Sequence, residues 1–217
     1  MTTRRGFINV CLRTLAVLAT LGVPETVLAK IAKRILPPKT DLRSLTDENP
    51  EYLDASQLPV TPLEKFDTMG ETNREIDINT WRLRITGQVD KEISLTYQDI
   101  TALPKVGKKV LLICPGVFAY VGQYTGVSII DILDQAGVAP GSDIVRIMGP
   151  QGVRGISKNF PIKDLQSGKV ILAYQVNGVT LPQKHGYPLR VVADEYYGHD
   201  WVKYVTEVHV LERNPKA

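Results

Sequence analysis

The sequence predicts an α+β domain that is rich in short strands and contains only a few short helices. Alternating apolar and charged residues at 81–87 predict a half-buried strand, and a continuous apolar run at 109–113 predicts a buried strand. Helical spacing of apolar residues is confined to short stretches, such as residues 127–136. Many strands with a few short helices are typical of an α+β arrangement.

The other elements follow from local patterns along the chain. We expect further strands at residues 93–96, 144–148, 170–176, 189–192 and 205–211. A short helix is expected at 97–102, because Thr96 can cap its first turn and Pro104 closes it, and a helical turn is expected at 161–165. Asn177-Gly178 predicts a tight turn.

The chain has 217 residues, enough for one domain of ordinary size with an N-terminal extension. Hydrophobic residues make up 43% of it, which is sufficient for a packed core. The formal net charge is +3, and three arginines against one glutamate place +2 of it in residues 1–29. The rest of the chain is nearly neutral, which argues against a nucleic-acid binder, since such proteins normally present a basic face.

Residues 1–29 are expected to be a twin-arginine signal peptide, which implies a periplasmic protein. Residues 4–8 hold two arginines, a glycine, a phenylalanine and an aliphatic residue, and a modest apolar stretch and a cleavage-like site ending at Ala29 follow. An uncleaved signal would act as an N-terminal membrane anchor; the alternative is an ordinary helix that contains two arginines. Because this route exports folded proteins, it also suggests a cofactor that is inserted before export.

Residues 30–62 are expected to form an extended linker or arm that precedes a folded domain at 63–217. The first part, 30–39, is basic and contains Pro37-Pro38. Residues 41–62 are polar, contain three prolines and show little periodicity. We therefore expect an arm that can wrap the domain.

The two cysteines have different expected fates. Cys11 lies in the signal, so the mature chain would keep Cys114 alone and could not form an internal disulfide. A lone thiol in an oxidising compartment is open to oxidation, so Cys114 is either buried and inert or takes part in chemistry. It ends a predicted buried strand and is followed by Pro115-Gly116, a position that fits either interpretation.

A second candidate cluster lies near the C-terminus. His185, Arg190 and Lys203 occur among glycines in residues 185–204. Arginine offers paired donors, lysine a point charge, and glycines allow backbone amides to approach, so an anion or phosphate pocket is expected. The alternative is ordinary surface charge. Tyr174, near the end of a predicted strand, is by position more typical of a core residue.

The order of these segments resembles the molybdopterin-binding catalytic domain of the sulfite oxidase family, including bacterial members exported by the twin-arginine route. The stretches that carry the resemblance are residues 172–178, 181–182, 185–192, 197–198 and 201–203. Upstream, the pattern at 81–87 is similar to the family's entry strand, and Cys114 followed by residues 124–127 is similar to its cysteine segment. The resemblance covers about residues 63–212.

The resemblance implies a β-rich molybdopterin-binding domain and a role for each matched residue. Cys114 would be the thiolate ligand of molybdenum beside the dithiolene of one pterin, a soft ligand for a soft site. Tyr174 would be catalytic and would face the metal-bound oxygen. The positions implied to bind the cofactor are Cys114, His185, Arg190, Trp201, Val202 and Lys203.

The resemblance also implies an activity and its partners. It points to an exported molybdenum-cofactor oxidoreductase that transfers an oxygen atom to or from a small sulfur- or oxo-containing substrate. Because the sequence holds no haem-attachment motif, we expect a separate redox partner, either a membrane b-type or a soluble c-type cytochrome.

Two departures from the family pattern bear on the substrate. The family usually has Pro-Gly where this chain has Ala193, Asp194 and Glu195. We expect the two acids near the pocket mouth, where they would discourage an anion such as sulfite. The family's substrate arginine has no clear match, and Arg74 is the candidate.

The residues alone are also compatible with two other functions. A thiol hydrolase or transpeptidase would pair Cys114 with His185 or His199. A non-catalytic accessory module would keep the fold without a redox role.

Overall fold

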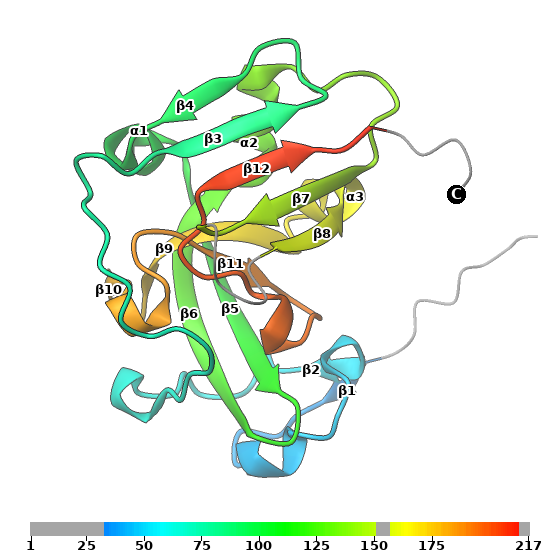
Figure 1. The fold of residues 1–217 in the computed structure, drawn as a ribbon. Coiled ribbons are helices and arrows are strands. Elements are labelled where there is room, and N and C mark those ends of the chain that lie inside the picture. The colour runs from blue at the N-terminus through cyan, green and yellow to red at the C-terminus, as the bar shows by residue number, and fades with distance from the viewer. Residues whose placement is uncertain (1–32, 151–156, 213–217) are drawn as a thin grey trace, which may run out of the picture. The chain divides into compact units, whose positions relative to one another are not determined.

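The computed structural model describes residues 33–150 and 157–212. Within these ranges two five-stranded sheets and one two-stranded sheet are accompanied by short helices, so the expected β-rich α+β class is confirmed (Figure 1). The predicted signal at 1–29 and Cys11 lie outside the described residues.

The first sheet carries the candidate cysteine. Its strands are β5 Lys105–Cys114, β6 Phe118–Ser128, β9 Val170–Val176, β10 Val179–Thr180 and β11 Arg190–Ala193. They run in the order β10-β9-β6-β5, with β11 also paired to β9. β5 and β6 form a long antiparallel hairpin whose last paired residues are Cys114 and Phe118, so Cys114 lies at the closed end of the hairpin.

The long strand β6 is a difference from the sequence-based expectation, which placed a helix from residue 127. Gly122 and Gly126 interrupt the apolar alternation that would have indicated a strand. At Gly126 a side chain has no room, because a Cβ would lie 2.0 Å from the Leu172 carbonyl oxygen of β9. The helix begins at Ile129, two residues after the expected start at 127, and the Ser128 side chain caps it.

The second sheet has the last strand of the chain at its centre. Its members are β3 Leu83–Gly87, β4 Ile93–Leu95, β7 Ile144–Met148, β8 Ser157–Pro161 and β12 Glu207–Val210. They run in the order β4-β3-β12-β7-β8, and β12 pairs parallel with β3 and antiparallel with β7. β8, like β6, was not expected from the sequence.

The helices are short, and side chains cap the first turns of two of them. They are α1 Tyr97–Ala102, α2 Ile129–Ala136 and α3 Ile162–Gln166. Thr96 and Asp99 form a reciprocal capping box at α1. None of the helices in the described ranges is long and apolar enough to cross a membrane.

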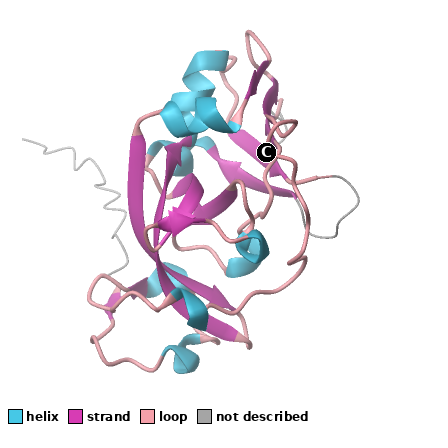
Figure 2. Ribbon diagram, turned by 90° about the vertical axis from the view of Figure 1, so that its left-hand side faces the viewer, coloured by secondary structure: helices cyan, strands magenta, loops and turns pink. Residues whose placement is uncertain are grey.

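The N-terminal arm packs against the β5–β6 hairpin. Its short strands β1 (Arg34–Ile35) and β2 (Leu53–Asp54) pair in parallel, and 3-10 helices surround them (Figure 2). Leucines of the arm form an apolar cluster with side chains of β5 and β6: Leu36, Leu45, Leu53, Leu58, Leu111, Ile113 and Val121. Burial of these side chains explains why a segment without helical or strand periodicity is ordered.

Candidate functional site

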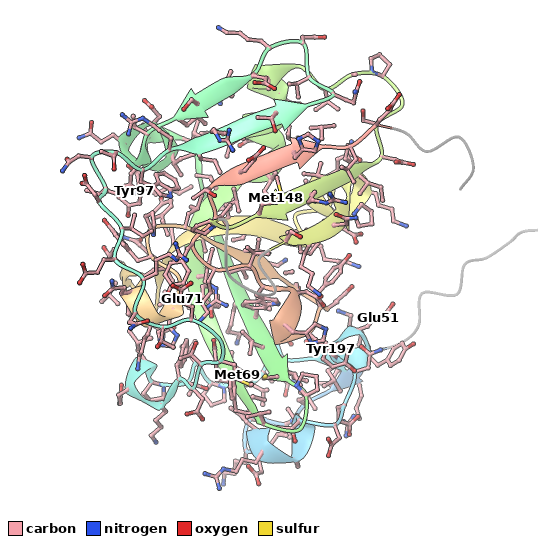
Figure 3. The ribbon with its side chains drawn as sticks, in the orientation of Figure 1. Glu51, Met69, Glu71, Tyr97, Met148 and Tyr197 are labelled. Carbon is pink, nitrogen blue, oxygen red and sulfur yellow. The ribbon has the colours of Figure 1, made fainter. Side chains whose placement is uncertain are left out.

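A pocket of about 280 Å³ opens at the end of the β5–β6 hairpin. Its lining residues are Asp67, Thr68, Met69, Gly70, Glu71, Leu112, Cys114, Phe118, Tyr120, Arg190, Gly198, His199, Trp201, Val202, Lys203 and Tyr204. Met69 and Glu71 are labelled in Figure 3. The lining joins segments that are far apart in sequence, since Thr68 and Lys203 are separated by 135 positions. We call this cavity the Cys114 pocket.

Cys114 is half-buried in the wall of this pocket. Its Sγ lies 3.3 Å from the Sδ of Met69. Burial raises the pKa of the Cys114 thiol, which is opposite to the lowered pKa of an activated nucleophile. Among the described residues no histidine is hydrogen-bonded to it, so the geometry does not favour a Cys/His thiol enzyme.

The metal-binding capacity of the protein side chains is small. In residues 33–150 and 157–212 no cluster of three or more histidine, cysteine, aspartate or glutamate side chains could hold a metal ion. A bare ion would need about four such ligands.

Arg190 is a buried cation that borders the pocket. Its side chain is only 4% exposed, and its guanidinium carbon lies 5.9 Å from the ring centre of Tyr124 and 5.4 Å from that of Trp201. Within the described part of the chain no carboxylate pairs with it, and its hydrogen bond is a long one to the Val191 carbonyl. Because a buried charge without a counterion is costly, this arrangement fits an anionic ligand.

His185 lies beside Arg190 and Lys203 but does not line the pocket. It is 1% exposed, and neither ring nitrogen has a hydrogen-bond partner among the described residues. Burial, and after it the charge of Arg190, lowers the pKa of His185 to about 4. The glycine at 186 allows the backbone beside His185 to lie close to the side chains of Lys203 and Arg190. A Cβ at this position would lie 3.0 Å from Lys203 and 3.2 Å from Arg190.

Acid is expected to destabilise the cofactor-free protein through His185. The pKa of this imidazole is about 4 in the folded protein against 6.5 for a free histidine, so the unfolded chain takes up the proton first as the pH falls. This contribution is complete above about pH 6.5 and is lost as the pH falls to about 4, by up to about 3 kcal/mol. Thermal unfolding of the wild type and His185→Gln across this range measures it; equal pH slopes in the two proteins would contradict the assignment.

Lys203 connects the C-terminal part of the pocket to the segment 67–71. Its ammonium donates to the Thr68 hydroxyl (2.9 Å), the Glu71 carbonyl (2.7 Å) and the Lys184 carbonyl (3.1 Å). Burial, and after it the charge of Arg190, lowers the pKa of Lys203 to about 8. The Tyr204 hydroxyl donates to the same Glu71 carbonyl at 3.3 Å.

The structure brings most of the predicted site residues together. Those that line one pocket are Cys114, Arg190, Trp201, Val202 and Lys203. Tyr174 does not join them: it is buried on β9, two strands away from β5, and its ring packs edge-on against Tyr97 at 6.4 Å. Tyr97 lies well away from Met69 in Figure 3. The Tyr174 hydroxyl is buried without a hydrogen-bond partner among the described residues, and the catalytic role of Tyr174 stays a prediction.

The expectation that Asp194 and Glu195 guard the pocket mouth is wrong. Neither residue lines the Cys114 pocket. Asp194 pairs with Lys108 at 3.4 Å, and Glu195 pairs with Lys33 and Lys169. Both acids are turned toward lysines of neighbouring segments, so they carry no argument about the substrate.

The segment 67–71 is the part of the site that sequence reasoning missed. It carries no motif, and its place beside Cys114 depends on hydrogen bonds to Lys203 and Tyr204. Arg74, the candidate substrate arginine, lies outside the lining and pairs with Glu71 at 3.0 Å.

Three relatives from very different organisms align with this chain. The "uncharacterized oxidoreductase YuiH" of Bacillus subtilis is 28% identical over 139 residues, which cover 64% of this chain and 69% of the relative. A nitrate reductase (NADH) of Ulva prolifera is 26% identical over 86% of this chain and 26% of its own length. The protein-methionine-sulfoxide reductase catalytic subunit MsrP of Xanthomonas campestris pv. campestris is 25% identical over 66% of this chain and 49% of its own length. The chain thus spans less than two thirds of the last two proteins.

A solved structure and a family model also match this chain. The sulfane dehydrogenase SoxCD of Paracoccus pantotrophus has the same fold, with a TM-score of 0.60 and 24% identity over 66% of this chain and 41% of its own. The sequence model described as the oxidoreductase molybdopterin binding domain matches residues 69–217, which include every residue predicted for the site. This chain therefore belongs to the family of oxidoreductase molybdopterin-binding domains.

Proposed function

We propose that this protein is an exported molybdenum-cofactor oxidoreductase that transfers an oxygen atom to or from a small sulfur- or oxo-containing substrate, with Cys114 as the protein ligand of molybdenum. The observation that carries the proposal is that Cys114 and a buried guanidinium border the same pocket, and that in residues 33–150 and 157–212 no second thiol occurs and no carboxylate pairs with that guanidinium. A cofactor with a soft metal at one end and a phosphate at the other would satisfy both groups. The name of the MsrP relative supports a sulfur–oxygen substrate.

The polar atoms around the pocket fit a pterin cofactor. The Trp201 Nε1 in the lining, and the Tyr124 hydroxyl and both ring nitrogens of His185 beside Arg190, are buried without a hydrogen-bond partner in the described part of the chain. The same holds for the Trp81 Nε1 and the Tyr174 hydroxyl, which lie outside the lining. Such orphaned groups are rare in folded proteins unless a ligand satisfies them. Arg190 would hold the phosphate end, with His185 beside it behind the lining, and Trp201 and Val202 would contact the pterin. We propose one pterin for each metal.

The protein's own residues position and shield the reaction. When bound, the cofactor supplies a two-electron redox centre at which an oxygen atom is exchanged: XO + 2 electrons + 2 protons gives X + water. The paired end of the β5–β6 hairpin holds Cys114 in a fixed position. Leu112 and Phe118 line the same pocket and exclude water beside the thiol. A separate cytochrome, membrane b-type or soluble c-type, would exchange the electrons.

Metal analysis of fractionated cells tests this proposal. The full-length chain is expressed in a molybdenum-replete host with an intact maturation system, and the periplasmic fraction is released by osmotic shock. We expect the protein in that fraction with stoichiometric molybdenum and pterin. Protein that lacks both, despite active maturation, would overturn the cofactor assignment, and loaded protein that stays in the cytoplasm would overturn export alone.

A further inference from the structure

One wall of the Cys114 pocket is formed by residues 67–71, and we propose that Met69 in this wall determines substrate specificity. The inference rests on the proposed function and adds a substrate class to it. The substrates that fit are uncharged sulfur compounds, sulfoxides or thioethers, rather than oxyanions such as sulfite or nitrate.

Met69 lies where a substrate would meet the thiolate side of the site. Its Sδ is 3.3 Å from Sγ of Cys114, yet 55% of the residue is exposed. A molecule that enters the pocket toward Cys114 therefore has to contact or displace this thioether. Methionine is flexible and apolar with a polarizable sulfur, so it can adapt to an apolar sulfur substituent but offers no donor to an anion.

Two other lining residues, Lys203 and Tyr204, fix the position of the wall at 67–71. An ammonium has three N–H donors, and Lys203 directs them to three oxygens of Thr68, Glu71 and Lys184. The Tyr204 hydroxyl adds a fourth contact to the Glu71 carbonyl. Lys203 consequently holds the wall in place and has no donor left for an anionic substrate.

The charges around Met69 also disfavour an anion. Asp67 lines the same pocket, and the other lining carboxylate, Glu71, is paired with Arg74, while Arg190 lies among aromatic rings in the part that would hold the cofactor phosphate. His199 also lines the pocket, and its Nε2 lies 3.6 Å from a carboxylate oxygen of Asp200. An oxyanion beside Met69 would lose hydration without gaining a donor from that side chain, whereas an uncharged sulfoxide or thioether loses little.

The test compares Met69→Leu with Met69→Lys in cofactor-loaded enzyme. The first variant keeps an apolar side chain of similar size, and the second adds a cation at the same place. Val179→Lys is the control, because Val179 is an exposed apolar residue on β10 outside the pocket lining. Molybdenum content is measured for every protein, so that loss of cofactor is separated from altered specificity.

Turnover is measured for a neutral and an anionic substrate in each direction. With reduced viologen dye as electron donor the pair is dimethyl sulfoxide and nitrate; the S–O bond breaks, and dimethyl sulfide and water form with two electrons and two protons. With ferricyanide as acceptor the pair is dimethyl sulfide and sulfite. We expect the wild type, Met69→Leu and Val179→Lys to prefer the neutral member, and Met69→Lys to shift the ratio of kcat/KM toward the anion by about tenfold or more, mainly through KM.

Two results would overturn the inference while leaving the cofactor assignment intact. One is a loaded wild type that prefers the anionic substrate. The other is an equal change of the substrate ratio in Met69→Leu and Met69→Lys. A wild type without molybdenum would overturn the proposed function, and this inference with it.

Discussion

Replacing Cys114 with serine is expected to abolish turnover and to weaken molybdenum retention while the fold survives. Serine is close to cysteine in size, and residue 114 is half-buried at a strand end, so the β5–β6 hairpin can keep its pairing. A neutral hydroxyl is a hard, weak ligand for a metal that prefers thiolate. Loss of an outer partner of a metal ligand typically costs 10–100-fold in activity, so loss of the ligand itself should cost more than about 100-fold.

The measurements are kcat with artificial dyes, bound molybdenum and the Tm of the same preparation. A Tm within a few degrees of the wild type would show that the fold is intact. Cys114→Ala is a second variant, since alanine removes the ligand and cannot replace it. Full molybdenum content together with full turnover in both variants would refute the ligand assignment.

Replacing Arg190 with methionine is expected to have opposite effects on cofactor retention and on the stability of the cofactor-free protein. Arg190 is 4% exposed and has no carboxylate partner among the described residues, so its burial without an anion is costly. A charge-assisted hydrogen bond contributes about 1.5–3 kcal/mol, so losing it should weaken cofactor binding roughly 10–100-fold. Without the cofactor, methionine should leave the stability unchanged or raise it.

Dialysis followed by pterin and molybdenum analysis measures retention, and denaturant unfolding measures the stability of the cofactor-free protein. Arg190→Lys serves as the matched variant, because lysine keeps the charge but loses the paired donors and should fall between the two. If Arg190→Met retains the cofactor as the wild type does and destabilises the cofactor-free protein, then Arg190 is structural and the anion site lies elsewhere.

The strands with a clear apolar pattern were predictable from the sequence. The patterns at 81–87 and 170–176 predict strands that include all of β3 and β9, and the run at 109–113 predicts half of β5. Their patterns are local, because alternation or continuous burial along one strand is visible within a few residues. β6 was missed because Gly122 and Gly126 break its pattern, and the need for Gly126 comes from its contact with Leu172 on another strand.

The sequence was sufficient to predict which residue types form the site, but not all the residues that line it. The lone thiol Cys114 and the cations Arg190 and Lys203 were identified from composition, order and resemblance, and they line one pocket. The same resemblance assigns a role to Tyr174, which packs against Tyr97 and is not among the lining residues, so that role stays a prediction.

Asp194 and Glu195 show why an acid's position along the chain says little about the substrate. They follow β11 closely in sequence, but lysines from three other segments draw both carboxylates away from the pocket. The direction of a surface side chain depends on partners that come from anywhere in the chain.

No local sequence pattern predicts that residues 67–71 form a wall of the pocket. Its contacts with Lys203 span 132 and 135 positions, and its own residues show neither periodicity nor a motif. The sequence was therefore sufficient for the fold class and for the thiol and cations that suit a metal–pterin cofactor, because periodicity and residue chemistry are local properties. Long-range packing placed Met69 beside Cys114 and turned the two acids away, because such contacts form only when distant segments meet in the folded chain.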